Sequence, residues 1–143
     1  MKIISFEGIE GVGKSTQISL LKEYLENQNY LVEIYREPGS TNIGENIRDI
    51  LLNNTNQLSN EAELLLMFAA RAELINQKIN VSKADYILLD RFYDASVAYQ
   101  GYGRNLSKTL IEELIVFIKC PMPQLSFLLD LSLIHISEPT RLL

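Results

Sequence analysis

One stretch near the N-terminus constrains the fold of this chain more than any other. Residues 8–15 read Gly-Ile-Glu-Gly-Val-Gly-Lys-Ser and fit the pattern G-x-x-x-x-G-K-[ST] of a phosphate-binding loop. An apolar run at residues 2–7 precedes this loop, and residues 14–27 place apolar side chains at helical spacing after it. The sequence therefore predicts a strand, a glycine-rich turn and a helix, which is the arrangement that holds phosphate groups in P-loop proteins.

The residue types in the loop suit a nucleotide and its metal ion. Glycines allow backbone conformations in which consecutive N–H groups point at one anion, and the start of the helix adds the positive end of its dipole. Lys14 can reach the terminal phosphates, and Ser15 can offer its hydroxyl to Mg²⁺. We expect ATP and Mg²⁺ as cofactors. The predicted cofactor-binding residues are Gly8, Ile9, Glu10, Gly11, Val12, Gly13, Lys14, Ser15 and Thr16.

Length and composition restrict the class of protein. The 143 residues suit one domain, and the net charge of −5 argues against a broad surface for polymeric nucleic acid. The sequence contains no apolar run of the length that spans a bilayer and opens without a signal peptide, so we expect no membrane partner and a cytoplasmic location. The single cysteine, Cys120, excludes an internal disulfide, and we expect it to pack as a small hydrophobic residue.

Strand and helix patterns alternate along the rest of the chain. After the first helix, strands are predicted at residues 30–35, 86–90 and 125–131, and helices at 43–52, 60–82 and 106–119. Ser59 suits the N-cap of the long helix, and Ile43, Ile47, Ile50 and Leu51 are predicted to share one face of the helix before it. Long connections between the strands favour a parallel sheet flanked by helices, which is an α/β fold.

Polar side chains follow three of the predicted strands. The phosphate-binding loop follows the first, Arg36-Glu37-Pro38 the second and Asp90-Arg91 the third. Since ligands bind at the carboxyl ends of parallel strands, we expect these segments to meet at one crevice. Asp90 would hold Mg²⁺ there, and Arg36 and Arg91 would face an anion. Arg71 lies in an apolar helical segment and needs either an anionic ligand or a neighbouring carboxylate as its partner.

These residues favour a kinase that acts on a small anionic acceptor. Phosphoryl transfer depends chiefly on positioning and on neutralising charge, which a P-loop beside several arginines supplies. A GTPase fits less well, because the sequence has no Asn-Lys-x-Asp motif for reading guanine.

Four sequence blocks together resemble the thymidylate kinase family. They are residues 6–17 around the P-loop, residues 36–41 (Arg-Glu-Pro-Gly-Ser-Thr), residues 68–71 (Phe-Ala-Ala-Arg) and residues 90–104, which contain Ala98-Tyr99-Gln100-Gly101. Their order and spacing match over residues 2 to about 131. The resemblance implies a P-loop fold of three layers and transfer of the ATP γ-phosphoryl group to dTMP with Mg²⁺. It also implies a homodimer formed through helices.

The resemblance assigns roles to individual residues. Lys14, Asp90 and Arg91 would be catalytic, and Ser15 and Asp90 would serve the metal. The substrate-binding residues would be Glu10 at the sugar hydroxyl, Arg36, Arg48 and Arg91 at the acceptor phosphate, Phe68 and Arg71 at the thymine, Tyr99 against the deoxyribose, Ser96 and Gln100 in the same pocket, and Glu37 to orient the acceptor or its metal. Met67 occupies the place where the family usually has the stacking aromatic, so either Met67 or Phe68 would cover the base.

The resemblance does not extend to residues 132–143. We expect a kinase domain at residues 1–131 that lacks the family's lid and C-terminal part, followed by a tail foreign to the family. Turnover by this chain is expected to be weak, because the arginines of the lid would be missing. Two other functions stay open: a deoxynucleoside kinase, which takes an uncharged acceptor, and a non-catalytic nucleotide-binding fragment.

Overall fold

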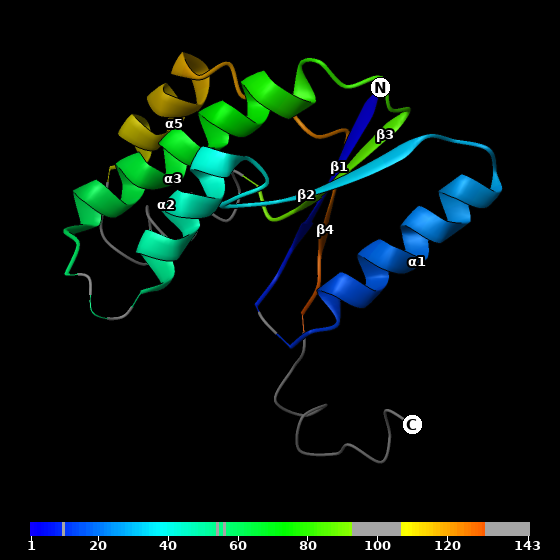
Figure 1. Ribbon diagram of the computed structural model, residues 1–143, viewed down its shortest axis with the longest axis horizontal. Helices are drawn as coiled ribbons and strands as arrows, with labels where there is room; N and C mark the ends of the chain where they lie inside the picture. The colour runs from blue at the N-terminus through cyan, green and yellow to red at the C-terminus, as the bar shows by residue number, and fades with distance from the viewer. Residues whose placement is uncertain (10, 54, 56, 93–106, 131–143) are drawn as a thin grey trace, which may run out of the picture.

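The computed structural model describes residues 1–9, 11–53, 55, 57–92 and 107–130 (Figure 1). Its strands are β1 (Lys2–Glu7), β2 (Val32–Arg36), β3 (Tyr86–Asp90) and β4 (Leu125–Leu128). Its helices are α1 (Lys14–Asn27), α2 (Asn42–Leu52), α3 (Asn60–Leu74), the π-helical turn η1 (Ile75–Ile79) and α5 (Lys108–Phe117). No described helix is long and apolar enough to cross a membrane.

The strands form one parallel sheet in the order β2-β3-β1-β4. Helix α1 lies on one side of the sheet, and α2, α3 and α5 lie on the other, so the molecule has three layers (Figure 1). The predicted α/β fold with a parallel sheet is therefore confirmed. Each connection between strands that are consecutive in the chain contains a helix, as the connection between parallel strands requires.

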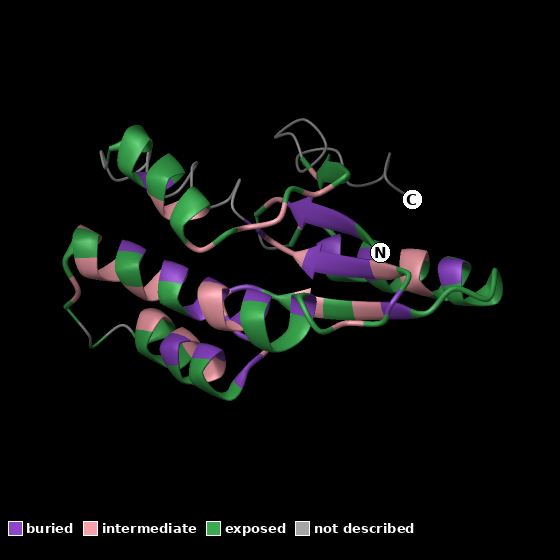
Figure 2. Cartoon of the chain, turned by 90° about the horizontal axis from the view of Figure 1, so that it is seen from above, coloured by how far each residue is buried: buried purple, intermediate pink, exposed green. Residues whose placement is uncertain are grey.

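The two central strands are buried on both faces (Figure 2). Alternate residues of a strand point to opposite faces, and the core divides accordingly. Ile3, Ile87 and Leu89 pack with Leu74 and Ile75 of α3 and η1. On the other face, a second cluster joins β1 and β3 to α1 and β2; it comprises Ile4, Phe6, Ile18, Leu25, Val32 and Leu88. Burial on both sides explains why β1 and β3 are almost continuously apolar.

The register of the sheet brings three strand ends to one level. Phe6 of β1 and Arg36 of β2 are both paired with Asp90 of β3. The loops that follow these strands therefore begin side by side, as expected for a ligand site in a parallel sheet.

The long helix differs from its predicted extent. Ser59 caps it as expected, accepting a hydrogen bond from the backbone N–H of Ala62 at 3.1 Å. The α-helix ends at Leu74 and the π-helical turn η1 continues it to Ile79, so the helical segment stops only a few residues short of the predicted end at about residue 82. Ser82 binds the N–H of Ala84 and the carboxylate of Glu33 instead of extending the helix. Such side-chain hydrogen bonds compete with helical ones and turn the chain toward β3.

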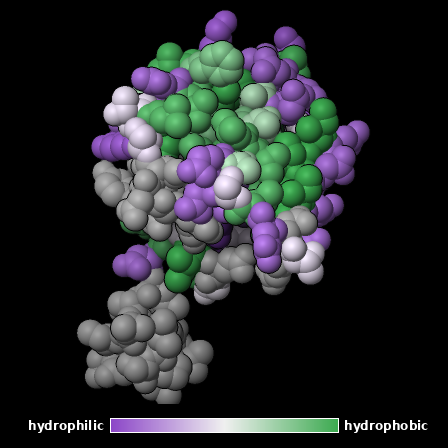
Figure 3. All heavy atoms as spheres, turned by 90° about the vertical axis from the view of Figure 1, so that its left-hand side faces the viewer, coloured by the Kyte–Doolittle hydropathy of each residue, from purple (hydrophilic) through white to green (hydrophobic). Residues whose placement is uncertain are grey.

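Helix α2 exposes more apolar surface than its pattern indicated. Ile47 is buried, but Ile43 and Ile50 of the predicted face are exposed, because α2 packs against α3 and leaves that flank uncovered. The outer surface of α2, α3 and α5 carries a broad apolar area (Figure 3). The large exposed hydrophobic residues of these three helices are Ile43, Ile50, Leu52, Leu65, Leu110, Val116 and Phe117.

Candidate functional site

The glycine-rich loop joins the end of β1 to the start of α1. Gly13 takes the N-cap position with φ +85°, in the left-handed region that a residue with a Cβ rarely adopts. Gly8 passes so close to β4 that a Cβ there would lie 2.7 Å from the carbonyl oxygen of Leu129. Both glycines are therefore required by the backbone path that leads to Lys14, the first residue of α1.

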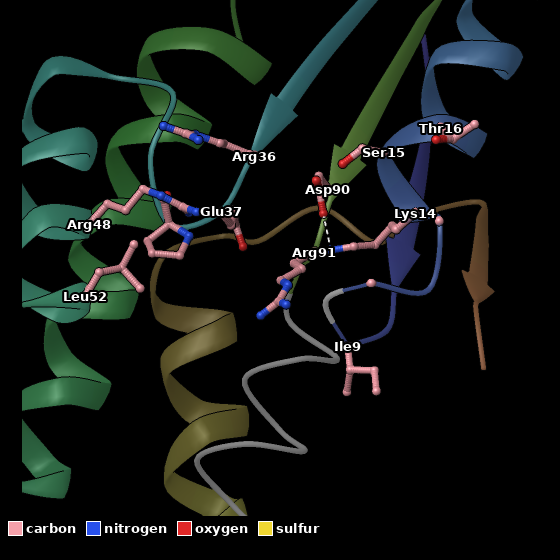
Figure 4. A pocket seen from close by; sticks show the side chains of 13 residues that line it. Ile9, Lys14, Ser15, Thr16, Arg36, Glu37, Arg48, Leu52, Asp90 and Arg91 are labelled. Atoms are coloured by element: carbon pink, nitrogen blue, oxygen red, sulfur yellow. Dashed lines mark hydrogen bonds and ion pairs between the residues drawn. The ribbon is translucent and has the colours of Figure 1, made fainter. Parts of the chain in front are cut away.

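Lys14 and Asp90 meet between the P-loop and the sheet. Lys14 Nζ lies 2.5 Å from Asp90 Oδ1, and Lys14 is buried (Figure 4). Asp90 ends β3, and the next residue, Arg91, has φ +70° and donates its backbone N–H to the carbonyl of Phe6. A positive φ is unusual for a residue with a long side chain, and such conformations cluster at functional sites.

The loop after β2 is held by hydrogen bonds to α2. Arg36 Nη2 lies 2.8 Å from Glu45 Oε2, and Glu45 also accepts the N–H of Ser40 at 2.8 Å. Because Arg36 binds this partly exposed carboxylate, the pKa of the Arg36 guanidinium is raised, and the pKa of the Glu45 carboxyl is lowered by the same contact. Arg48 donates to the carbonyl of Pro38, which follows a cis peptide bond, at 2.9 Å.

Arg71 finds its partner in a carboxylate of the protein. Its Nε donates to Glu37 Oε1 at 3.0 Å and to Oε2 at 2.8 Å, and its Nη2 lies 2.6 Å from Oε2. Arg71 is only 1% exposed and Glu37 only 4%. Burial raises the pKa of the Glu37 carboxyl, and the charge of Arg71 opposes this rise. Burial alone would lower the pKa of Arg71, but the charge and hydrogen bonds of Glu37 outweigh it, and Arg71 stays protonated.

Two aromatic rings flank the Arg71 guanidinium. Its central carbon lies 5.1 Å from the ring centroid of Phe68 and 5.4 Å from that of Phe92, within the range of cation–π contacts. Phe68 is buried with Leu64 and Ile111 and does not line the cavity. The backbone N–H of Phe92 donates to Glu7 Oε1 at 2.9 Å, which ties the end of β1 to the same cluster.

The segments after the three strands enclose one cavity of about 500 Å³. It is lined by Ile9, Gly11, Gly13, Lys14, Ser15, Thr16, Arg36, Glu37, Pro38, Arg48, Leu52, Asp90 and Arg91. In the close-up view, Glu37 lies between Arg48 and Arg91, and the Lys14–Asp90 pair lies beyond them (Figure 4). The cavity has the cationic groups of a P-loop at one end and several arginines at the other, so two phosphorylated ligands could meet there.

The predicted site residues divide into three groups. Eleven line the cavity, from the P-loop (Ile9, Gly11, Gly13, Lys14, Ser15, Thr16) and the two later loops with α2 (Arg36, Glu37, Arg48, Asp90, Arg91). Gly8, Val12, Phe68 and Arg71 do not line it, and Arg71 lies directly behind Glu37. Glu10, Ser96, Tyr99 and Gln100 lie outside the described residues.

Four residues that hold this site together were missed by sequence reasoning. They are Glu7, Ser40, Glu45 and Phe92. Glu7 carried a usable signal, because a carboxylate at the end of an otherwise apolar buried strand needs a donor. Glu45 and Ser40 carried none, since their partners are set by the path of the loop.

The oxygen ligands available in the cavity fit Mg²⁺. Ser15 and Asp90 both line it, and hydroxyl and carboxylate oxygens are the ligands that this ion prefers. Among the described residues, no group of three or more metal-binding side chains comes together. Mg²⁺ usually binds to one or two carboxylates and to substrate phosphates rather than to a cage of protein side chains.

A parallel sheet with a P-loop after its first strand and a carboxylate at the end of a neighbouring strand defines a P-loop nucleotide-binding protein. The model of the thymidylate kinase family matches residues 6–137. Thymidylate kinase from Prosthecochloris aestuarii is 47% identical over 132 residues, which cover 90% of this chain and 59% of the relative. Thymidylate kinase from Kosmotoga olearia is 51% identical over 116 residues, covering 80% and 56%.

A solved structure supports the same grouping. The crystal structure of thymidylate kinase from Ehrlichia chaffeensis superposes with a TM-score of 0.83 at 35% identity, covering 98% of this chain and 82% of that one. The chain therefore belongs to the thymidylate kinase family. It spans between half and two thirds of the length of the two curated relatives named above.

Proposed function

We propose that this protein is a nucleoside monophosphate kinase that transfers the γ-phosphoryl group of ATP to dTMP and gives dTDP. The observation that carries the proposal is that the P-loop residues Lys14 and Ser15 and the loop residues Arg36 and Arg91 line the same cavity. Membership of the thymidylate kinase family supports dTMP as the acceptor. We infer the kinase domain to be residues 1–131.

At the donor end, the P-loop amides and the start of α1 would hold the ATP phosphates. Lys14 would neutralise charge on the terminal phosphates, because it is the cation at the first turn of α1 and lies in the cavity wall. Ser15 and Asp90 would hold Mg²⁺, which when bound would neutralise phosphate charge. Asp90 also fixes the position of Lys14, since the two side chains are 2.5 Å apart.

At the acceptor end, Arg36, Arg48 and Arg91 would bind the phosphate of dTMP. Arg48 is fixed by Pro38 and Arg36 by Glu45, so these donors are ordered before a ligand binds. Preordered donors lose less side-chain entropy on binding. Arg71 would recognise the thymine, with Phe68 and Glu37 against its guanidinium.

The experiment that tests the proposal measures ADP release and ligand affinity for three acceptors. Purified protein is titrated calorimetrically with dTMP, thymidine and AMP, and ATP turnover is followed with each in the presence of Mg²⁺. We expect dTMP alone to bind tightly and to stimulate ADP release. Tighter binding of thymidine would indicate a deoxynucleoside kinase, and a folded protein that binds ATP but no acceptor would refute the proposal.

We also infer a homodimer, formed through the apolar outer surface of α2, α3 and α5 (Figure 3). Leu65 of α3 is 58% exposed, and large exposed apolar patches mark interaction sites in other proteins. Light scattering coupled to size exclusion should report twice the chain mass for the wild type and the chain mass for Leu65→Glu. The matched control is Lys22→Glu on α1, on the opposite side of the sheet, which should stay dimeric. A monomeric wild type at micromolar concentration would refute the inference.

A further inference from the structure

We propose that Glu37 is a positioning residue that fixes the guanidinium of Arg71 and thereby sets the selectivity of the acceptor site for the base. The proposal rests on the proposed function. It concerns a carboxylate that lines the cavity and lies between Arg36 and Pro38, the two residues that connect the loop to α2.

The contacts of the pair fix the plane of the guanidinium. Glu37 binds two of the three nitrogens of Arg71, with distances of 2.6–3.0 Å, and the rings of Phe68 and Phe92 lie against the central carbon. A bidentate carboxylate and ring contacts together leave a planar side chain little freedom to turn. Any rotation of Arg71 would break charged hydrogen bonds inside the protein, where they are costly to lose.

Stability alone does not account for this pair. Both side chains are almost fully buried, and the cost of removing two charges from water often equals or exceeds their attraction. Replacing such a pair with apolar residues of similar volume is often neutral or stabilising in proteins. Glu37 lines the ligand cavity and Arg71 lies directly behind it, so the pair is better explained by the fixed orientation that Glu37 gives to Arg71.

Through its neighbours in the chain, Glu37 is also linked to the arginines that would bind the phosphate of the acceptor. The next residue, Pro38, accepts a hydrogen bond from Arg48, and the preceding residue, Arg36, is bound to Glu45. Glu37 thus fixes the side chain for the base at a set position relative to those for the phosphate. A nucleotide contacts both, so its base and its phosphate must match that separation.

A guanidinium only donates hydrogen bonds, which gives the proposal a chemical test. Thymine offers a carbonyl oxygen at the ring position where 5-methylcytosine carries an amino group, which is itself a donor. A fixed Arg71 therefore favours dTMP over 5-methyl-dCMP, and an Arg71 that can turn away discriminates less. The readout is the ratio of the two dissociation constants, measured calorimetrically with the full chain.

The variants are Glu37→Gln, Glu37→Asp, Arg71→Met and the double variant Glu37→Gln/Arg71→Met. Glu37→Gln should lower the ratio about tenfold or more, the effect expected for loss of a charged hydrogen bond. Glu37→Asp keeps the charge and should lower it less. In the Arg71→Met background, Glu37→Gln should have no further effect, because Glu37 acts through Arg71. The control Glu26→Gln removes a carboxylate from an exposed pair with Lys22 and should leave the ratio unchanged.

Circular dichroism separates loss of selectivity from loss of folding, and Glu37→Asp and the double variant serve if Glu37→Gln does not fold. An unchanged ratio of the two dissociation constants in folded Glu37→Gln or Glu37→Asp would overturn the inference about Glu37 and leave the proposed function intact. So would an equal effect of Glu37→Gln with and without Arg71, which would mean that Glu37 contacts the ligand itself. If the wild type binds neither nucleotide in preference to AMP, the proposed function fails, and the inference fails with it.

Discussion

Replacing Arg71 with methionine removes the charge that Glu37 depends on and leaves the apolar volume of the side chain nearly intact. Glu37 is 4% exposed, and its carboxylate loses all the contacts of 2.6–3.0 Å that Arg71 makes with it. Removing one partner of a buried ion pair costs about 3–5 kcal/mol, which is a large share of the roughly 5–15 kcal/mol that stabilises a domain. We expect Arg71→Met to lower the free energy of unfolding at pH 7.5 by about that amount.

The loss should depend on pH in a defined direction. Burial raises the pKa of Glu37, and Arg71→Met removes the charge and the hydrogen bonds of Arg71 that oppose this rise. A carboxyl whose pKa is higher in the folded than in the unfolded state contributes stability below its unfolded pKa of about 4.3, and this contribution is lost as the pH rises through the folded pKa. The loss in free energy of unfolding caused by Arg71→Met should therefore be smaller at pH 5 than at pH 7.5.

Urea denaturation followed by circular dichroism at both pH values measures these differences. Lys22→Met is the control, because it removes a cation from an exposed pair with Glu26 and should change the free energy of unfolding by about 0.5 kcal/mol or less. A loss below about 1 kcal/mol for Arg71→Met, or a deficit that grows as the pH falls, would refute the argument that the pair is buried and mutually dependent.

Further predictions concern the P-loop, the lone cysteine and the loop after β2. Lys14→Ala should weaken ATP·Mg binding by about tenfold or more, because it removes charged hydrogen bonds to phosphate; equal calorimetric affinities would contradict its role. Cys120, whose thiol pKa is raised by burial to about 12, should react slowly with iodoacetamide at pH 8 and quickly in urea, and stability should fall as the pH rises from about 8.5 toward 12. Fast alkylation of the native protein at pH 8 would contradict the raised pKa of this partly buried thiol. Ser40 has φ +70°, and its hydroxyl binds both the N–H and the carbonyl of Arg36. Ser40→Ala and Ser40→Gly both lose these bonds and should lower the melting temperature, Ser40→Ala the more because it keeps the unfavourable φ. An unchanged melting temperature in both variants would mean that the bonds do not hold the loop, and the reverse order would mean that the φ of Ser40 is not strained.

The elements that could be predicted from the sequence are those with strong local signals. The P-loop, the Ser59 cap and the apolar run of β3 each depend on neighbouring residues, and the structure has them at the predicted places. The parallel sheet followed from the alternation of strands and helices. The helical segment ends at Ile79, a few residues before its predicted end, where Ser82 contacts Glu33 from 49 positions away, a partner that no local signal reveals.

The loops that form the candidate site could be predicted from the sequence, but the ion pairs between their side chains could not. The sequence placed Arg36, Asp90 and Arg91 at strand ends, and the cavity contains all three. It left the partner of Arg71 open between a ligand and a carboxylate, because only the folded loop brings Glu37 to α3. The roles of the individual site residues, and the domain boundary at residue 131, stay predictions.

Strand β1 serves two purposes with alternate side chains. Ile4 and Phe6 pack toward α1, whereas Ile3, Ser5 and Glu7 face the other way, and Glu7 binds the backbone N–H of Phe92 beside Arg71. A slip of β1 by one residue would exchange Phe6 with Glu7, placing a carboxylate in the apolar cluster and a ring behind the acceptor site. A misregistered sheet could then retain neither its core nor its site. The fraction of molecules in a preparation that bind ligand would therefore equal the fraction whose sheet has formed in the correct register.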